Sequence, residues 1–215
     1  ANARFGNRGI NVTGGGYILY DFSYDKASQS ELFNRASKKL EEINSANNLT
    51  TDEKTALTQE ANTAADKAKE EITNATTNDV VIEAQNNGVS AIDGIKVPTE
   101  SAVKEAAKKA VADAATAKNN AIDASNLTDE EKAALKQKVT EAQNAANQAI
   151  DNATTDAAVT DAEENGIKAI NSIEVPTKST AKDQATTDLN NEVDEAKKAI
   201  DQDNNLTDEQ KQAAK

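Results

Sequence analysis

The sequence repeats itself with a period of about 78 residues over all but its first part. Residues 48–54 read NLTTDEK, residues 126–132 read NLTDEEK, and residues 205–211 read NLTDEQK. A second block, NGVSAIDGIKVPT from Asn87, returns as NGIKAINSIEVPT from Asn165. Repetition on this scale predicts tandem structural units, each stabilised partly by packing against its neighbours.

Each complete unit divides into three amphipathic stretches, which in the second unit span about residues 100–124, 129–153 and 156–173. Small apolar residues recur at steps of three and four, as on one face of a helix. We therefore predict an all-α fold built from tandem three-helix bundles. In the first stretch the expected seam is Val103, Ala107, Ala110, Ala114, Ala117 and Ala121, with Val111 and Ile122 beside it.

The NLTDEEK block predicts a helix start. Thr128 is placed as an N-cap, and Glu131 three residues later completes a capping box, in which each side chain binds the other residue's amide. Thr50 with Glu53 repeats the pattern, and Thr207 with Gln210 repeats it with a neutral amide. The acidic residues after the cap also suit the positive end of the helix dipole.

Two other interpretations of this block are weaker. The N-x-T triplets are potential glycosylation acceptors at Asn48, Asn126 and Asn205, but their threonines already serve the cap. Calcium binding by the acidic cluster is disfavoured, because the glycine and terminal glutamate of an EF-hand loop are absent. We therefore predict no metal site there.

Gly88 and Gly166 lie inside predicted helices, where glycine costs about 1 kcal/mol relative to alanine. We expect close contact with a neighbouring helix to compensate for this cost. Because alanine buries little apolar area, each bundle should be thin and only modestly stable.

The predicted domains are residues 25–98, 99–176 and a partial third repeat at 177–215. Pro98 and Pro176 follow a valine that they bias away from helical geometry, and each proline suits the first turn of the next helix. Because three helices is an odd number, the chain leaves a unit at the end opposite to its entry. Successive units should therefore stack end to end into a rod, and the stop inside the third repeat suggests a longer array.

Residues 1–24 have a different composition. GINVT, three glycines and YILYDFSY read as strand, turn and strand. We interpret this β-type segment as the end of an upstream domain or as a hairpin packed on the first helices; an appended tail is the alternative.

Composition restricts the function. The net charge of −13 argues against nucleic-acid binding and against an electrostatic hold on anionic lipid, and no apolar run is long enough to span a membrane. The chain contains neither cysteine nor histidine, which removes thiol nucleophiles and the usual metal ligands. The expectation is a protein that is not an enzyme, without catalytic residues, cofactor or metal.

From about Asp25 onward, the NLT-DEEK, ATT and G-I-x-A-I-x-x-I-x-V-P blocks resemble the tandem domain-of-unknown-function 1542 repeats of Gram-positive cell-wall-anchored surface adhesins, which are similar in style to FIVAR modules. The resemblance implies secreted stalk repeats between a binding region and a wall anchor, on the bacterial cell surface. It provides no catalytic residues.

The leading hypothesis is a structural stalk that projects an N-terminal binding domain from the cell wall. The repeats would contact one another within a monomer, and the upstream domain would bind a host extracellular-matrix protein or glycan. The alternative is a helical module that binds matrix or serum proteins, or that mediates intercellular contacts in biofilms. Residues 36–215 lack aromatic and arginine side chains, which weakens tight binding by the repeats but not weak multivalent contact.

Overall fold

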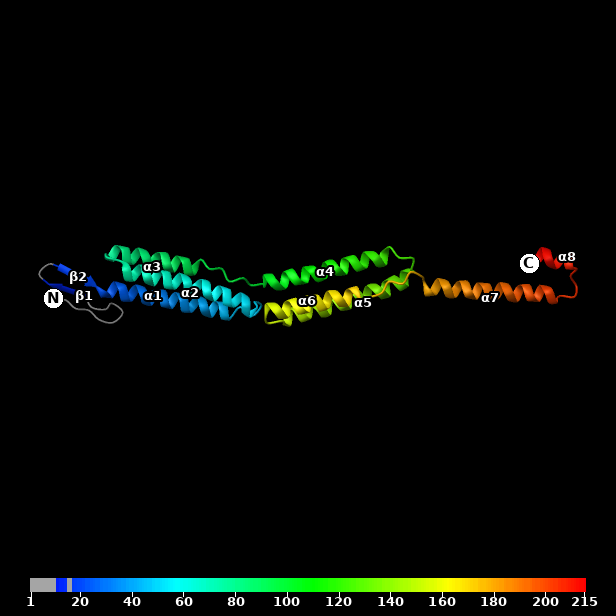
Figure 1. Ribbon diagram of the computed structural model, residues 1–215, viewed down its shortest axis with the longest axis horizontal. Helices are drawn as coiled ribbons and strands as arrows, with labels where there is room; N and C mark the ends of the chain where they lie inside the picture. Colours follow the sequence, from blue (N-terminus) through cyan, green and yellow to red (C-terminus); the bar gives the residue numbers. More distant parts are fainter. Residues whose placement is uncertain (1–10, 15–16) are drawn as a thin grey trace. The chain divides into compact units, whose positions relative to one another are not determined.

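A computed structural model describes residues 11–14 and 17–215, with side chains described from Ala27 onward; residues 1–10 and the predicted turn at 15–16 lie outside this description. The described part contains two short strands followed by eight helices (Figure 1). The all-α class and the short β-type N-terminal segment are thereby confirmed.

The two strands are β1, Asn11–Gly14, and β2, Tyr17–Asp21. They pair antiparallel, from Asn11 opposite Asp21 to Gly14 opposite Tyr17, with an irregularity between Asn11 and Thr13. The predicted extension of the second strand to Tyr24 is wrong, because helix α1 already begins at Phe22. Once a helix has formed, each added residue gains one hydrogen bond for the two dihedral angles it fixes, so a helix readily extends by a turn.

The first three helices form one bundle. They are α1, Phe22–Asn44, α2, Thr51–Asn74, and α3, Asn78–Asp93, and each contacts the other two. Thr50 caps α2 and Thr77 caps α3 through the Val80 amide, and Gly94 is the C-cap residue that follows α3. These caps satisfy amides that have no partner inside the helix.

The core of this bundle is narrow and mixes branched residues with alanine. Leu32 lies at its centre and is fully buried. The cluster around it consists of Ala65, Ala68, Ile72, Val81, Ala84 and Ile92. Short side chains allow the helix axes to approach closely, as the glycine and alanine content predicted.

The next three helices are α4, Ala102–Asp123, α5, Asp129–Asn152, and α6, Asp156–Asn171. They meet at Gly166 of α6, where an added Cβ atom would collide with the Ala146 Cβ and touch the side chain of Val111. The predicted close contact at this glycine is therefore confirmed. Gly88 makes the same kind of contact with Ala68 in the first bundle.

The predicted seam of α4 is displaced by one position. Its fully or nearly fully buried residues are Ala107, Val111, Ala115 and Ile122, whereas Ala117 and Ala121 are exposed. Alanine lies on every side of this helix, so alanine spacing does not identify the buried face. The branched residues do, because they bury more apolar area.

The last two helices are α7, Thr180–Gln202, and α8, Asp208–Ala214, which contact each other weakly. Neither has a buried residue. Leu189 and Val193 of α7 are 63% and 42% exposed.

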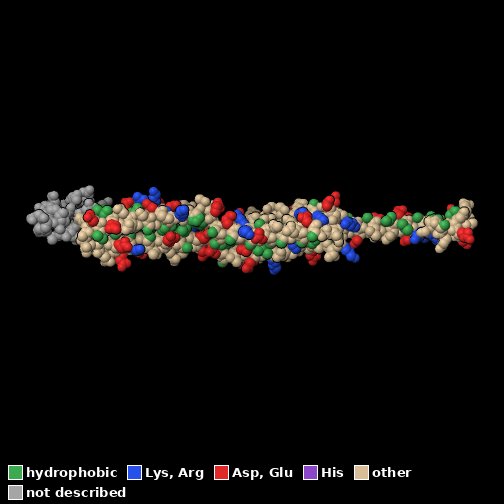
Figure 2. All heavy atoms as spheres, turned by 90° about the horizontal axis from the view of Figure 1, so that it is seen from above, with side chains coloured by type: hydrophobic (Ala, Val, Ile, Leu, Met, Phe, Trp, Pro, Cys, Tyr) green, Lys and Arg blue, Asp and Glu red, His purple; other side chains and the backbone are tan. Residues whose placement is uncertain are grey.

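The chain divides into two compact units. One ends at Lys108 and includes Ala149–Ala162; the other contains Lys109–Gln148 and Glu163–Lys215. The division passes through α4, α5 and α6, so the contacts around the α3–α4 connection lie inside the first unit and those around the α6–α7 connection lie inside the second. Acidic and basic side chains are interspersed over the visible helical surface (Figure 2).

A lysine of the first helix in each bundle binds the end of the third helix. Lys39 Nζ donates to Ile95 O at 2.9 Å, and Lys118 Nζ donates to Ile173 O at 2.7 Å and to Asn171 O at 3.1 Å. Positive charge suits the carbonyl end of a helix, and the bond satisfies an oxygen that α3 or α6 leaves free.

Replacing Lys39 by methionine should lower the free energy of unfolding by about 1 kcal/mol, because the buried Ile95 carbonyl loses its charged donor while the apolar stem still packs. Chemical denaturation followed by circular dichroism measures this change. The exposed neighbour Lys38 supplies the matched control, Lys38→Met, which should leave stability within about 0.5 kcal/mol of the parent chain. Equal effects of the two substitutions would contradict the role of Lys39.

Candidate functional site at the helix junctions

Among the described residues, side chains and backbone amides form a network of hydrogen bonds at each connection between one set of three helices and the next. We call these two connections the junctions. No group of His, Cys, Asp and Glu residues that could hold a metal ion occurs in residues 11–14 and 17–215. Over the same residues, each helix is too short or too polar to cross a membrane.

The first junction begins at the loop between α1 and α2. Thr50 is fully buried and caps α2: Glu53 N donates to Thr50 Oγ1 at 3.1 Å, and Thr50 N donates to Glu53 Oε1 at 2.9 Å. The predicted capping box is present. Lys54 Nζ then donates to Asn44 O at 3.1 Å, which ties the start of α2 to the end of α1.

Glu53 also binds the start of the next helical set. Ser101 Oγ donates to Glu53 Oε1 at 2.6 Å, and Ala102 N donates to Glu53 Oε2 at 3.1 Å. Ser101 in turn caps α4, because its Oγ accepts from Lys104 N at 3.1 Å. One carboxylate therefore binds the N-terminal groups of two helices, α2 and α4.

The loop between α5 and α6 supplies further contacts. Thr50 Oγ1 donates to Asp156 Oδ1 at 2.6 Å, and Asp156 N donates to Asp52 Oδ2 at 2.8 Å. Thr51 N donates to Thr154 O at 2.8 Å. The start of α2 thus binds the start of α4 on one side and the turn before α6 on the other.

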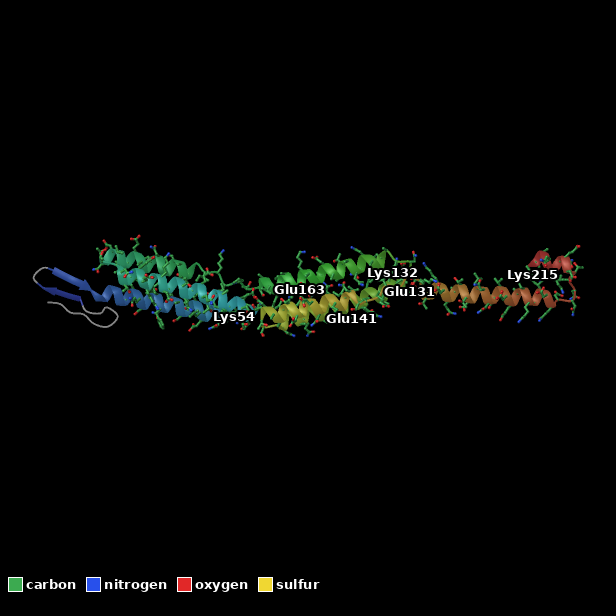
Figure 3. All side chains as sticks on the ribbon, viewed as in Figure 1. Lys54, Glu131, Lys132, Glu141, Glu163 and Lys215 are labelled. Atoms are coloured by element: carbon green, nitrogen blue, oxygen red, sulfur yellow. The ribbon has the colours of Figure 1, made fainter. Side chains whose placement is uncertain are left out.

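The second junction repeats the contacts of the bridging glutamate. Glu131 Oε1 accepts from Thr128 N at 3.0 Å in the capping box and also accepts from Ser179 Oγ. Its Oε2 accepts from Thr180 N at 3.1 Å, at the start of α7. Ser179 caps α7 through Lys182 N at 3.1 Å. Figure 3 shows Glu131 at the start of α5, close to the point where α7 begins.

The third capping box joins Thr207 and Gln210 and starts α8. Gln210 has one carbonyl oxygen, which accepts from Thr207 N at 2.9 Å. A glutamine in this position offers an N–H donor where Glu53 and Glu131 offer a second acceptor oxygen. The third box therefore differs chemically from the first two.

Sequence reasoning identified the capping glutamates but missed their second function. It also placed Pro98 and Pro176 in the first turn of the following helices, which is wrong, because α4 begins at Ala102 and α7 at Thr180. The helices start after Ser101 and Ser179, whose side chains provide the cap that proline lacks. The available signal was the serine three residues after each proline, at equal positions in both repeats.

The potential glycosylation acceptors lie at these same loops. Asn48 Nδ2 donates to Thr99 O at 3.1 Å, so the amide nitrogen that would carry a glycan is bound within the junction. The hydroxyls of Thr50 and Thr128 accept from Glu53 N and Glu131 N in the caps.

The junction contacts lower the pKa of both bridging glutamates. The hydrogen bond from Ser179, together with the Thr128 amide, lowers the pKa of Glu131 to about 2. For Glu53, partial burial acts to raise the pKa, but the bonds from Ser101 and from Thr50 outweigh it and the net pKa is lowered. Both carboxylates are therefore stabilised in the charged form.

Stability should consequently fall in acid. Because the pKa of Glu131 is about 2 when folded and about 4.3 in an unfolded chain, its contribution is complete above about pH 4.5 and is lost as pH falls towards 2. Titrating the side-chain carbon signal by NMR measures this pKa. Ser179→Ala should raise it towards the ordinary value, whereas Ser172→Ala, at the end of α6, should not. An unchanged pKa in Ser179→Ala would contradict the assignment.

Comparison with protein-family models assigns most of the sequence to a known family. The model described as Domain of Unknown Function (DUF1542) matches residues 26–100 and 103–178. The chain belongs to the DUF1542 family. Ser101 and Ala102 lie between the two matched ranges, and Ser179 directly follows the second. In both cases the bridging glutamate of a DUF1542 repeat binds the residues that immediately follow the matched range.

Curated proteins of Staphylococcus aureus are similar to this chain. The extracellular matrix-binding protein EbhA of strain Newman is 34% identical over 177 residues, which cover 82% of this chain and 5% of the relative. The extracellular matrix-binding protein ebh of strain USA300 / TCH1516 is 34% identical over 211 residues, covering 97% of this chain and 2% of the relative. This DUF1542 chain thus spans a small part of the relatives' length. No solved structure matches it.

Proposed function

We propose that the DUF1542 repeats of this chain serve as a structural spacer in a bacterial cell-surface adhesin, projecting an N-terminal binding domain from the cell wall. The observation that carries this proposal is the shared carboxylate, which appears at two successive junctions with the same partners. Such a bond couples the start of one repeat to the capping box of the repeat before it. The relatives, described as extracellular matrix-binding proteins, support a surface location.

The odd number of helices in a repeat supports the same function. The chain enters each three-helix set at one end and leaves it at the other, so every added repeat continues onward. The first and second helices of the two complete repeats have 22–24 residues, so each is about 33–36 Å long. Each repeat should lengthen the spacer by about the length of one such helix. We propose the same domain boundaries that the sequence predicts. They are a β-type segment at residues 1–24, complete repeats at residues 25–98 and 99–176, and a partial repeat at residues 177–215.

Distance measurements between spin labels test this proposal, because the chain has no cysteine and labels can be placed singly. Labels at the exposed Lys67 and Asp183 span both junctions. The spacer requires a long distance with a narrow distribution, and the substitution pair Glu53→Gln and Glu131→Gln should broaden it. A short distance, or scattering from a compact particle, would refute the proposal. Sedimentation tests the accompanying expectation of a monomer.

Direct matrix binding is the second candidate, favoured by the description of the relatives as extracellular matrix-binding proteins and by one side chain. Phe33 of α1 is 64% exposed, and exposed aromatic residues frequently anchor protein interfaces. Binding of the full chain to immobilised matrix proteins, compared with Phe33→Ala, tests this candidate. Val80→Ala serves as control, because Val80 is the other large exposed apolar residue of the first repeat. Binding that is absent, or equal in both variants, would reject it.

A further inference from the structure

Each complete repeat contains one Asn-Gly pair, and the pair lies inside the third helix of the repeat. Asn87–Gly88 belongs to α3 and Asn165–Gly166 belongs to α6, and the sequence has no other such pair. In both pairs the asparagine is exposed and the glycine is buried. An added Cβ atom at the glycine would collide with Ala68 Cβ in one repeat and with Ala146 Cβ in the other. Packing therefore requires each glycine, whereas it does not require the asparagine before it.

An asparagine that precedes a glycine can lose ammonia without an enzyme. The amide nitrogen of the glycine attacks the asparagine Cγ and gives up its proton, a new C–N bond forms, and the bond from Cγ to Nδ2 breaks to release ammonia. Water then opens the resulting cyclic imide at either carbonyl carbon. One opening yields aspartate, and the other yields isoaspartate, in which the main chain runs through the former side chain. Glycine favours the ring closure because it has no Cβ atom to obstruct the attack.

The folded helices oppose this reaction in two ways. Helical φ and ψ angles hold the asparagine Cγ away from the next amide nitrogen, so ring closure needs a rotation that breaks the helix. The glycine amide is also occupied, because each N–H inside an α-helix donates to the carbonyl four residues earlier. The reaction at Asn87 or Asn165 therefore requires that the helix open first.

Isoaspartate at Asn87 would stop the first bundle from re-forming its contacts. It adds a methylene group to the main chain directly before Gly88, which changes the register of the rest of α3. The residues that follow include Ile92, which is fully buried, and Ile95, whose carbonyl accepts from Lys39 Nζ at 2.9 Å. These contacts depend on the lost register.

The second repeat has the same dependence. The residues after Asn165 include Ile170, which is fully buried, and Ile173, whose carbonyl accepts from Lys118 Nζ at 2.7 Å. Modification of either asparagine would therefore damage the helix that completes its bundle.

We propose that Asn87 and Asn165 are sites of spontaneous deamidation, which the folded repeat suppresses and which unfolding of the repeat permits. A brief opening of the helix is reversible. An opening that lasts long enough for the ring to form converts the repeat into a product that does not refold, so deamidation marks repeats that have been unfolded. This property goes beyond the spacer function and is independent of it.

Incubation of the full chain at mildly alkaline pH, either folded or in guanidinium chloride, tests the proposal. Tandem mass spectrometry of proteolytic fragments measures deamidation at Asn87 and Asn165. Both should react about 100-fold more slowly in the folded chain, because only the opened fraction reacts. Asn86 is the internal control, since it is also exposed but precedes an asparagine, and it should react slowly in both states. Equal rates at Asn87 in the two states would overturn the proposal.

Refolding tests the consequence of the reaction. After removal of the denaturant, chains with isoaspartate at position 87 should exchange the amides of residues 89–92 at least about tenfold faster than untreated chains. Asn87→Asp adds only the charge at an exposed position and should refold with the exchange rates of the parent chain.

The double variant Asn87→Gln and Asn165→Gln controls for other damage during the treatment. Glutamine would have to form a larger ring, which closes more slowly, so the treated variant should refold with normal protection. Normal protection in the isoaspartate chains, or lost protection in the treated glutamine variant, would contradict the proposal.

Discussion

Replacing Gly88 by valine is expected to lower the free energy of unfolding of the α1–α3 bundle by about 3 kcal/mol. A Cβ atom at this position would lie 2.5 Å from Ala68 Cβ and 2.6 Å from Leu32 Cδ2. The Ala68 Cβ is fixed to its helix and cannot rotate away, so α2 and α3 must separate. The gain in helix propensity of about 1 kcal/mol or less offsets only part of this cost.

Chemical denaturation of Gly88→Val, Gly88→Ala and Ser90→Val measures the effect. Ser90 is an exposed residue of the same helix, so Ser90→Val controls for the β-branched side chain alone. Gly88→Ala should lose less stability than Gly88→Val, and the double variant Gly88→Ala with Ala68→Gly should recover part of the loss by moving the methyl group across the contact. Equal stability of Gly88→Val and Ser90→Val would show that the close approach is unimportant.

Replacing Glu53 by alanine is expected to lower the free energy of unfolding by about 2 kcal/mol. The substitution removes a charged acceptor from the Thr50 amide, the Ser101 hydroxyl and the Ala102 amide together. Charged hydrogen bonds contribute more than neutral ones, but the half-exposed position of Glu53 reduces the total. The loss should exceed that of an ordinary capping residue, because two helices lose a partner.

Glu53→Gln separates the two functions of this side chain. Its carbonyl oxygen can retain the Thr50 amide, but its NH₂ group would face the Ala102 amide, donor against donor. Amide exchange should therefore accelerate at Ala102 more than at Thr50, whereas Glu53→Ala should accelerate both. Glu60→Ala, at an exposed residue of α2, is the matched control. Equal acceleration at both amides in Glu53→Gln would contradict the proposed bridge.

The sequence was sufficient to predict the helices and their starts, because these depend on local chemistry. The threonine and the glutamate of a capping box are three residues apart, so the Thr50 and Glu53 pair was recognisable without a structure. Gly88 and Gly166 were also recognisable as close contacts, since glycine inside a helix otherwise weakens it.

The buried face of α4 and the inter-repeat bonds were harder to predict. Alanine lies all around α4, so only Val111 and Ile122 distinguish its buried side. The bond between Glu53 and Ser101 joins residues 48 positions apart, and it depends on how the chain turns after Pro98. Periodicity within a helix carries no information about such a contact.

The shared carboxylate makes the start of one repeat depend on the capping box of the repeat before it. Glu53 belongs to the capping box of α2, so melting of the first turn of α2 also deprives α4 of its bonds to Ser101 and Ala102. Loss of α4 removes no member of the box formed by Thr50 and Glu53, which remains intact. Loss of the α5–α6 turn, however, deprives the Thr50 hydroxyl, the Thr51 amide and Asp52 of their partners. Each repeat therefore depends on its neighbour at this point, and the two should unfold together rather than independently.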